Sequence, residues 1–190
     1  MYSLTYVKNL SGEPMLVKKK NSSEFTHLDL IAAQKVAYEP SGLMMCHFAV
    51  EAESEEYAAS EFKMNNLNIK FRVAKITPTK IGQFVTIWKR IGGGPIQPFD
   101  ITDPFDLFVI SVRTPKHFGQ FVFPKLVLCE KGIVSKDGKE GKRAIRVYPP
   151  WDITDNNQAI KTQKWQLPYF FEIPFNAQVD VSRVQKLFLL

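Results

Sequence analysis

The chain has 190 residues, of which 45% are hydrophobic and 13% aromatic, and its formal net charge is +6. The length suits one domain, and the apolar content can form a core without disulfides or a metal, which excludes an intrinsically disordered chain. No apolar run reaches the roughly 18 residues that span a bilayer, and the first residues lack the layout of a signal peptide, so we expect a cytoplasmic protein without a membrane partner.

The charge is distributed unevenly. Residues 1–61 hold 5 Lys and 9 acidic residues, whereas residues 62–190 hold 20 Lys and Arg and 10 acidic residues. We therefore expect one domain over 1–190, with an acidic, helical part over about 1–61 and a basic, sheet-rich part over about 62–190. The asymmetry suggests a surface that faces a polyanion, and ordinary solubility charge is the alternative.

The chain has two cysteines, Cys46 and Cys129, each in an apolar stretch. Neither has a partner at a metal-ligand spacing. We expect two reduced and mostly buried thiols, and no bound cofactor.

The first predicted helix begins after Ser22 or Ser23, runs to about Tyr38 and ends at Pro40-Ser41-Gly42. One face of this helix would hold Leu28, Ile31, Ala32, Lys35 and Val36, which have the i, i+3, i+4 spacing. The glutamate-rich stretch 51–61 is predicted to be a solvated helix or a strand edge.

Five strands are predicted next. Residues 67–76 alternate with a period of two, which places Lys70 and Arg72 on a basic outer face. The others are 84–88, the nearly all-apolar and therefore central 106–112, 121–128, and 144–148 after a charged loop at 135–143. Helices are predicted over 156–166 and 180–190. The fold class is therefore α/β (α+β), a single domain with one central mixed sheet flanked by helices.

A basic turn is the first candidate site. Lysines and arginines contact phosphates, and threonine hydroxyls add neutral hydrogen bonds. Basic residues beside an aromatic suit single-stranded or deformed nucleic acid as well as duplex. The alternative is a strand-turn-strand whose lysines face water. The residues concerned are Arg72, Lys75, Thr77, Thr79, Lys80, Gln83, Trp88, Lys89 and Arg90.

A second basic group follows later in the chain. Lys161 and Lys164 share a helix face, and the loop before them could clamp a backbone. A solvated loop and a polar helix face form the alternative. The group comprises Lys139, Lys142, Arg143, Arg146, Lys161, Gln163 and Lys164.

An acidic group precedes the central strand, with Asp100, Asp103 and Asp106 followed by Gln120 and Lys125. In metal-dependent nucleases such acids hold Mg²⁺ and a lysine stabilises charge on phosphate. Here Gln120 and Lys125 are five apart, an odd offset that places them on opposite faces of a strand. The acids therefore suit the capping of turns better than catalysis.

Three stretches resemble the MepB-like family over about residues 20–175. They are Phe71 to Arg90 with Lys75-Ile76-Thr77-Pro78-Thr79-Lys80 at its centre, Gly119 to Lys125, and Gly141 to Gln166 with Tyr148-Pro149-Pro150-Trp151. The resemblance implies a restriction-endonuclease-like fold, nucleic-acid binding, and in some bacteria a gene beside a multidrug-efflux transporter and its MarR-type regulator.

The leading hypothesis is a non-catalytic protein that binds DNA or RNA. The alternatives are a Mg²⁺-dependent nuclease that uses Asp103, Asp106, Gln120 and Lys125, and a protein-interaction module in drug-resistance regulation. DNA versus RNA, sequence preference and oligomeric state stay open. The expected contact residues are Arg72, Lys75, Thr77, Thr79, Lys80, Gln83, Lys89, Arg90, Lys142, Arg143, Arg146, Lys161, Gln163 and Lys164.

Overall fold

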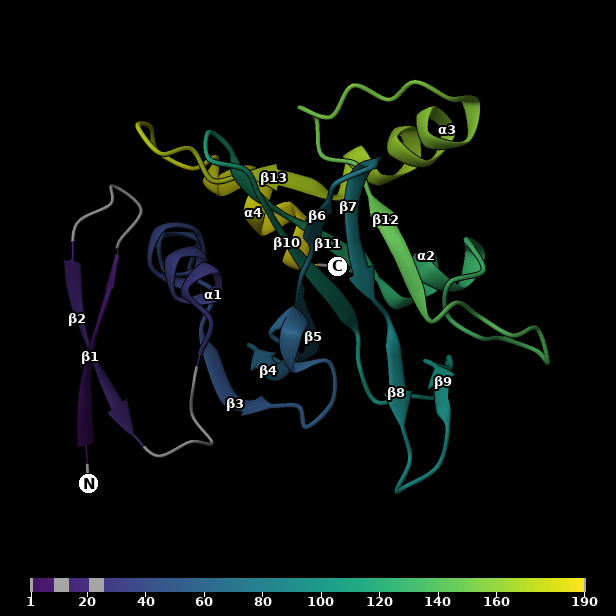
Figure 1. Cartoon of the computed structure of the whole chain (residues 1–190), viewed down its shortest axis with the longest axis horizontal. Helices are drawn as coiled ribbons and strands as arrows, with labels where there is room; N and C mark the ends of the chain where they lie inside the picture. The colour runs from purple at the N-terminus through teal and green to yellow at the C-terminus, as the bar shows by residue number, and fades with distance from the viewer. Residues whose placement is uncertain (1, 9–13, 21–25, 190) are drawn as a thin grey trace.

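A six-stranded mixed sheet runs through the centre of the molecule (Figure 1). The computed structural model describes residues 2–8, 14–20 and 26–189. In order across the sheet, the strands are β13 (Phe170–Glu172), β11 (Phe118–Pro124), β10 (Leu107–Arg113), β5 (Leu67–Val73), β4 (Ser60–Met64) and β3 (Met45–Val50). Only β5 and β10 pair in parallel; the other neighbours in this sheet are antiparallel.

The hairpin of β10 and β11 forms the centre of this sheet. Every residue from Leu107 to Val112 is buried, because both faces of β10 are covered. Ser111 lies directly opposite Gln120 in the register of the two strands. Both polar side chains are therefore buried on the same face of the sheet.

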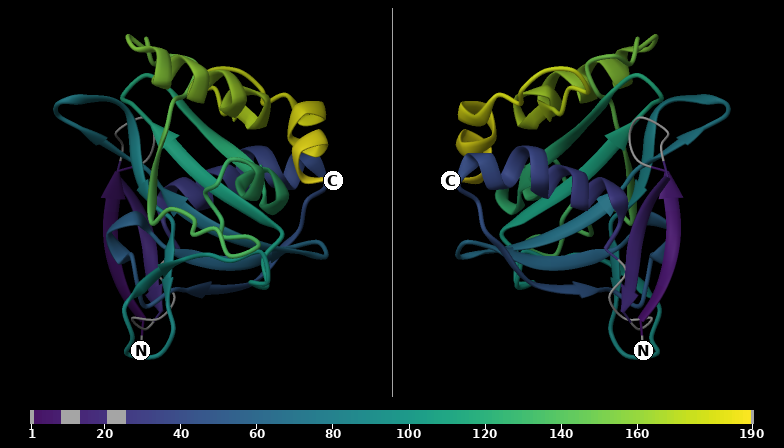
Figure 2. Two further views of the ribbon diagram at one scale, coloured as in Figure 1. Left: turned by 90° about the vertical axis from the view of Figure 1, so that its right-hand side faces the viewer. Right: turned by 90° about the vertical axis from the view of Figure 1, so that its left-hand side faces the viewer.

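Helices cover that face. α1 (Leu28–Ala33) continues into a π-helical turn (Gln34–Tyr38), and α4 (Val181–Phe188) lies beside it (Figure 2). The core on this side joins the helices to the sheet through Leu30, Ala33, Ala37, Tyr38, Val184, Leu187, Phe188, Ile69, Phe71, Leu107, Val109, Phe118 and Val122. Tyr38 also donates a 2.5 Å hydrogen bond to the side-chain oxygen of Gln120. The buried glutamine is thus partly satisfied by the helix that covers it.

The opposite face is covered by a second, three-stranded sheet. It contains β12 (Ala144–Val147), β7 (Lys80–Thr86) and β6 (Lys75–Thr77) in that order. α2 (Lys125–Glu130) and α3 (Asn157–Gln166) complete this layer, and α3 lies near the end of β12 (Figure 1). Its core contains Val85, Ile145, Val147, Leu128, Phe108, Ile110, Phe121 and Phe123.

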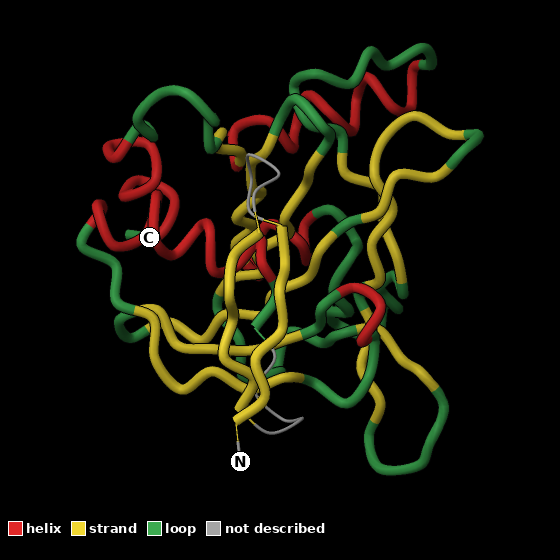
Figure 3. The backbone as a smooth tube through the Cα atoms, turned by 60° about the vertical axis from the view of Figure 1, so that its left-hand side comes forward, coloured by secondary structure: helices red, strands yellow, loops and turns green. Residues whose placement is uncertain are grey.

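Two further hairpins complete the strands. β8 (Trp88–Arg90) pairs with β9 (Ile96–Pro98), and β1 (Tyr2–Lys8) pairs antiparallel with β2 (Pro14–Lys20). In the backbone tube of Figure 3, strands and loops make up more of the described chain than helices do. Within the described ranges, no helix is long and apolar enough to cross a membrane.

A mixed α+β domain with a central mixed sheet and few helices is therefore confirmed. The predictions for 106–112, 144–148, 156–166 and 180–190 match β10, β12, α3 and α4. The prediction of one sheet is wrong, because β6, β7 and β12 form a separate sheet that packs across the first.

The predicted first helix differs at its start and in its buried face. α1 begins at Leu28 and is capped by the His27 side chain, which accepts a hydrogen bond from the Asp29 amide at 3.1 Å. Ser22 and Ser23 lie outside the described residues. Lys35 and Val36 are exposed, because the buried face contains Leu30, Ala33 and Ala37, which are spaced i, i+3 and i+7.

The predicted strand 67–76 is two strands in two sheets, since β5 ends at Val73 and β6 begins at Lys75. The prediction of a basic outer face is wrong. Arg72 is fully buried, because the second layer covers this face of β5. Its guanidinium donates to Glu51 Oε2 at 2.5 Å and to the Phe71 carbonyl at 2.8 Å, and lies 5.5 Å from the Phe108 ring centre. Burial lowers the pKa of Arg72, and Glu51 opposes this.

Three other boundaries also differ. Strand β11 ends at Pro124, and residues predicted as its continuation form α2, because proline has no N–H for a strand ladder. The predicted strand 84–88 spans the end of β7 and the start of β8. The stretch 51–61 contains a single 3-10 turn (Glu55–Tyr57) and then enters β4.

The two thiols have different surroundings. Cys46 on β3 is exposed, which contradicts the prediction that both are mostly buried. Cys129 in α2 is half-buried, and burial raises the pKa of its thiol.

We predict that Glu51→Gln destabilises the fold by about 2–4 kcal/mol, because it leaves the buried Arg72 charge without a counter-ion. Glu56→Gln is the matched control, since Glu56 pairs with Lys75 where both side chains are exposed. It should cost less than about 1 kcal/mol. Urea unfolding of the two variants measures the difference, and equal losses would show that the buried pair has no special weight.

Candidate nucleic-acid interface

Ion pairs join the acidic and basic parts of the chain. Glu51 and Glu61 lie 2.7 and 2.6 Å from Lys70 Nζ. Two further pairs are Lys75–Glu56 at 2.8 Å and Arg90–Glu53 at 2.7 Å. The charge segregation of the sequence is therefore partly neutralised in the fold, and these cations are less available to a polyanion than expected.

The first basic group does not form one surface. Lys89 pairs with Asp103, and Thr77 accepts a 2.8 Å hydrogen bond from Arg146. Thr79 in the turn between β6 and β7 is exposed, and so is Lys80, the first residue of β7. The other cations of this group each pair with an acidic residue. Lys80 is exposed and has no acidic partner within 4 Å in the described part of the chain.

Two glutamines among the expected contact residues make hydrogen bonds within the fold. Gln83 is buried, and its amide exchanges hydrogen bonds with the backbone of Arg113 at 3.3 and 3.4 Å. Gln163 donates to the carbonyls of Pro149 and Asp152 at 3.0 and 2.9 Å. Gln163 therefore holds the segment after β12 against α3.

Lys142 and Arg146 of the second basic group line a hollow of about 410 Å³, which we call the basic hollow. The end of α2, strand β12 and helix α3 line it. Its cations are Lys131, Lys142 and Arg146, its aromatic side chains are Tyr148 and Trp165, and its other residues are Ile133, Ala144, Ile145, Gln158, Thr162 and Gln166.

The cations of the basic hollow have no carboxylate within 4 Å among the residues that the structure describes. Arg146 donates to the Gly82 carbonyl at 3.0 Å and to Thr77, so its guanidinium has a fixed position without neutralisation. The Lys131 ammonium lies 5.7 Å from the centre of the Trp165 ring. Positive charges held together without counter-ions attract anions.

Helix α3 presents its inner face to the basic hollow. Gln158, Thr162 and Trp165 are spaced four and three residues apart, which places them on one side of the helix. Successive residues of a helix are about 100° apart around its axis, so Lys161 lies roughly 40° from Trp165 and borders this face. Lys161 and Lys164 are both exposed, so they extend the basic surface beyond the hollow.

Gln166 fixes the distance between α3 and β12. Its side chain is buried, accepts from the Tyr148 amide at 2.9 Å and donates to the Arg146 carbonyl at 3.0 Å. This pair of hydrogen bonds mimics an additional strand on the edge of β12. The aromatic and cationic walls of the basic hollow are therefore held by backbone contacts.

Arg143, also predicted as a contact, pairs with Glu140 at 2.6 Å. Both partners are exposed, so this pair is weak and the guanidinium can exchange partners.

The acidic group caps turns before β10. Asp103 accepts from the Asp100 amide at 2.7 Å, and Asp106 accepts from the Asn68 amide at 2.7 Å. Lys125 Nζ donates to the Asp103 carbonyl at 2.9 Å, whereas Gln120 is buried under α1. Across the described ranges, no three His, Cys, Asp or Glu side chains are arranged to hold a metal ion.

Comparison with known proteins identifies the relatives of this fold. The model of the MepB-like family matches residues 51–172, which is more than half of the chain. The chain belongs to the MepB-like family. A solved structure described as the crystal structure of MepB is similar at 36% sequence identity, with a TM-score of 0.66, over 70% of this chain and 89% of that one. No curated protein matches.

The MepB-like region extends from the glutamates that pair with the basic strands to the end of β13. It therefore includes the whole basic hollow. Sequence reasoning found Lys142 and Arg146 but missed Lys131, Tyr148 and Trp165 as members of one site. Residues 121–128 before Lys131 were predicted to be a strand, but residues from Lys125 form α2. Lys131 directly follows this helix, and that position places it near α3.

Gly82 supports the wall of the basic hollow. Its φ is +83°, and a Cβ there would lie 2.6 Å from the ring of Tyr148. We predict that Gly82→Ala destabilises the protein more than Gly138→Ala, because Gly138 has a similar φ of +76° but open space around it. Gly138→Ala measures the backbone strain alone, which is about 1–2 kcal/mol. Gly82→Ala has the same strain and also displaces the Tyr148 ring, which adds about 1–3 kcal/mol.

Urea unfolding of both variants measures this difference. Equal losses would mean that the Tyr148 ring moves at no cost and does not depend on Gly82 for its position.

Proposed function

We propose that this protein binds nucleic acid, without catalysis, by seating the phosphate backbone in the basic hollow. The observation that carries the proposal is the meeting of Lys131, Lys142 and Arg146, uncompensated by acids in the described chain, beside two aromatic rings. Phosphate oxygens would supply the missing negative charge. Gln158 and Thr162 would add neutral hydrogen bonds to phosphate or sugar.

Single-stranded nucleic acid is the favoured ligand. Tyr148 and Trp165 are half-buried, so the part of each ring that solvent reaches would contact a base or sugar. Stacking on aromatic side chains beside a cationic groove is the usual basis of binding to single strands. The exposed cations Lys139, Lys161, Lys164 and Lys80 would extend the track on either side of the basic hollow.

The wider parts of the proposal follow from the family resemblance. We propose that the domain is a restriction-endonuclease-like relative that binds without cutting, that it acts in the cytoplasm, and that it serves a multidrug-resistance operon. The nuclease alternative is less favoured, because the carboxylates of Asp103 and Asp106 are engaged with Lys89 and Asn68. The interaction-module alternative would use the same basic hollow for an acidic protein.

We predict that a labelled single-stranded oligonucleotide binds with an affinity that falls steeply between about 50 and 200 mM salt. Lys131→Gln, Lys142→Gln and Lys161→Gln should each weaken binding and reduce the slope of log affinity against log salt by about 0.7. Fluorescence anisotropy across a salt series measures both quantities.

Lys186→Gln is the matched control. Lys186 is an exposed lysine of α4, on the opposite side of the six-stranded sheet. It should leave affinity and slope unchanged. Wild-type protein that ignores DNA and RNA even at low salt, or equal losses in the control, would overturn the proposal.

A further inference from the structure

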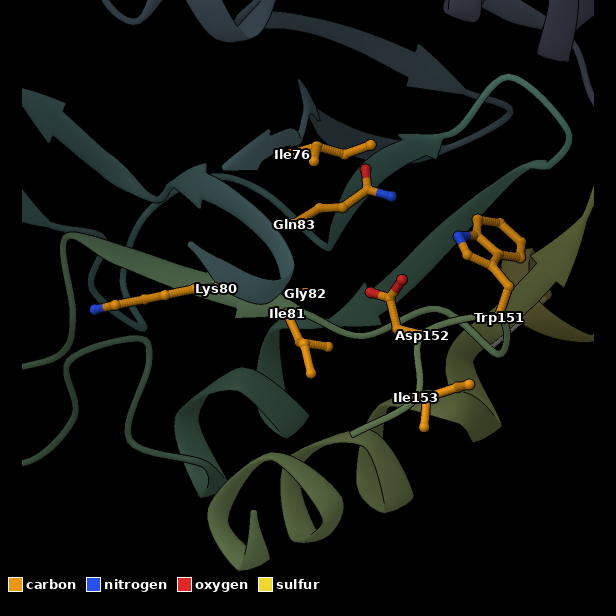
Figure 4. A pocket seen from close by; sticks show the side chains of 8 residues that line it. All are labelled: Ile76, Lys80, Ile81, Gly82, Gln83, Trp151, Asp152 and Ile153. Atoms are coloured by element: carbon orange, nitrogen blue, oxygen red, sulfur yellow. The ribbon is translucent and has the colours of Figure 1, made fainter. Parts of the chain in front are cut away.

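A second hollow of about 370 Å³ lies on the other side of Gly82 (Figure 4). Residues of β6 and the first half of β7 form one wall, and the segment 151–153 after β12 forms the other. It is lined by Ile76, Lys80, Ile81, Gly82, Gln83, Trp151, Asp152 and Ile153, and we call it the Trp151–Asp152 pocket.

Two buried polar atoms of this pocket lack a partner. Trp151 Nε1 and Asp152 Oδ2 have no hydrogen bond to any described residue, although both atoms are shielded from bulk solvent. Figure 4 shows the indole nitrogen of Trp151, the carboxylate of Asp152 and the amide of Gln83 directed toward the same space. Buried donors and acceptors are nearly always satisfied, so this pair points to a ligand that supplies both an acceptor and a donor.

The surroundings of Asp152 agree with this. Burial raises the pKa of its carboxyl to about 6, and a hydrogen bond from the Gly82 amide only partly opposes this. No cation neutralises the group in the described structure. An N–H donor from a ligand would compensate the buried carboxylate.

The indole of Trp151 is held in place. Its ring stacks on His117 with ring centres 4.8 Å apart and an interplanar angle of 12°, and packs edge-on against Phe170. The mouth of the pocket is apolar, since Ile76, Ile81 and Ile153 are 60%, 37% and 87% exposed. A flat molecule would contact apolar side chains on its faces and the polar pair on its edge.

We propose that the Trp151–Asp152 pocket binds a single nucleobase. The Watson–Crick edge of every base presents an N–H donor beside an acceptor, which fits Asp152 and Trp151 together. A small inorganic anion would be repelled by the carboxylate, and an apolar ligand would leave both polar atoms unpaired. Gln83 forms part of the pocket wall, where its amide is held by the backbone of Arg113.

The pocket shares a wall with the basic hollow. Arg146 lines the basic hollow and donates to the Gly82 carbonyl, while the Tyr148 ring lies against Gly82. A strand whose phosphates lie in the basic hollow would therefore pass this wall and insert one unstacked base, with Lys80 near its next phosphate. A base that belongs to such a strand is one source of the ligand, and this source rests on the proposed function. A free nucleoside or nucleotide is the other source.

The first experiment titrates the intact protein with cytidine, uridine, adenosine and guanosine, each separately. The chain has three tryptophans, so the indole N–H signal of Trp151 can be assigned in a two-dimensional NMR spectrum by its loss in Trp151→Phe. A nucleoside in the pocket should shift this signal and leave that of Trp88 unchanged. Asp152→Asn should abolish the shift.

The second experiment compares an oligonucleotide series in which one base at a time is replaced by an abasic site. Asp152→Asn and Trp151→Phe should each weaken binding of the intact strand by about tenfold, with the salt slope unchanged because no phosphate contact is lost. Both should lose sensitivity to the abasic site. Asp155→Asn and Trp88→Phe are the matched controls, and Asp152→Asn suffices where Trp151→Phe does not fold.

The outcomes separate the two proposals. Nucleosides that shift Trp151 while oligonucleotides do not bind would support the pocket with a free ligand and overturn the nucleic-acid proposal. Sensitivity to the abasic site without a nucleoside shift would support a base within a strand. Oligonucleotide binding that is indifferent to both variants and to every abasic site, with no nucleoside shift, would overturn the pocket and assign water to its polar atoms.

Discussion

The buried ion pair of Arg72 and Glu51 determines which charges of this protein face solvent. A guanidinium on β5 beneath the second layer needs a counter-ion, and Glu51 supplies it from the segment that precedes β4. Once Glu51 is fixed, Glu53 and Glu56 come within reach of Arg90 and Lys75. The glutamate-rich stretch is thereby used to neutralise the middle of the chain, and the cations around β12 and α3 stay uncompensated by it.

The two hollows depend on one thin wall. Gly82 has no side chain, so the Tyr148 ring can lie directly on its backbone, and the Gly82 carbonyl accepts from Arg146. Among the described residues, the cations on one side of this wall have no acidic partner, and the donor and acceptor on the other side have no hydrogen-bond partner. Under the proposed function, a phosphate and its base would occupy these two environments at neighbouring positions.

Local patterns in the sequence predicted the elements whose burial follows from their own period. The apolar run of β10, the amphipathic α4 and the capped α3 were all recognisable from short windows. The alternation around Arg72 correctly separated two faces but could not show that both were covered, because a second sheet is formed by distant residues. The same limit applies to Gln83 and Gln163, whose partners are backbone groups elsewhere in the chain.

The candidate site was predictable only in part for a related reason. Basic residues are visible in a sequence, but whether each has an acidic partner is decided by contacts across 14 to 37 positions, as for Lys89–Asp103 and Arg90–Glu53. Trp151 ends the Tyr148-Pro149-Pro150-Trp151 string that resembles the family, but no motif in the sequence links it with Asp152 as a polar pair. That pairing depends on two atoms that have no partner among the described residues, which no pattern of residue types reveals.

The acidic group before β10 bears on the choice between binding and cleavage. Asp106 precedes β10, whereas Gln83 of the Trp151–Asp152 pocket contacts Arg113 at the other end of the same strand. A strand of seven residues spans roughly 20 Å, so these carboxylates and the pocket lie far apart. Metal-dependent hydrolysis of a phosphodiester places carboxylates and metal at the bound phosphate itself. A strand that inserts a base into the pocket would therefore have that nucleotide far from the acids that resemble a nuclease motif. The carboxylates of Asp103 and Asp106 are engaged with Lys89 and Asn68, and they hold the turn that starts the central strand.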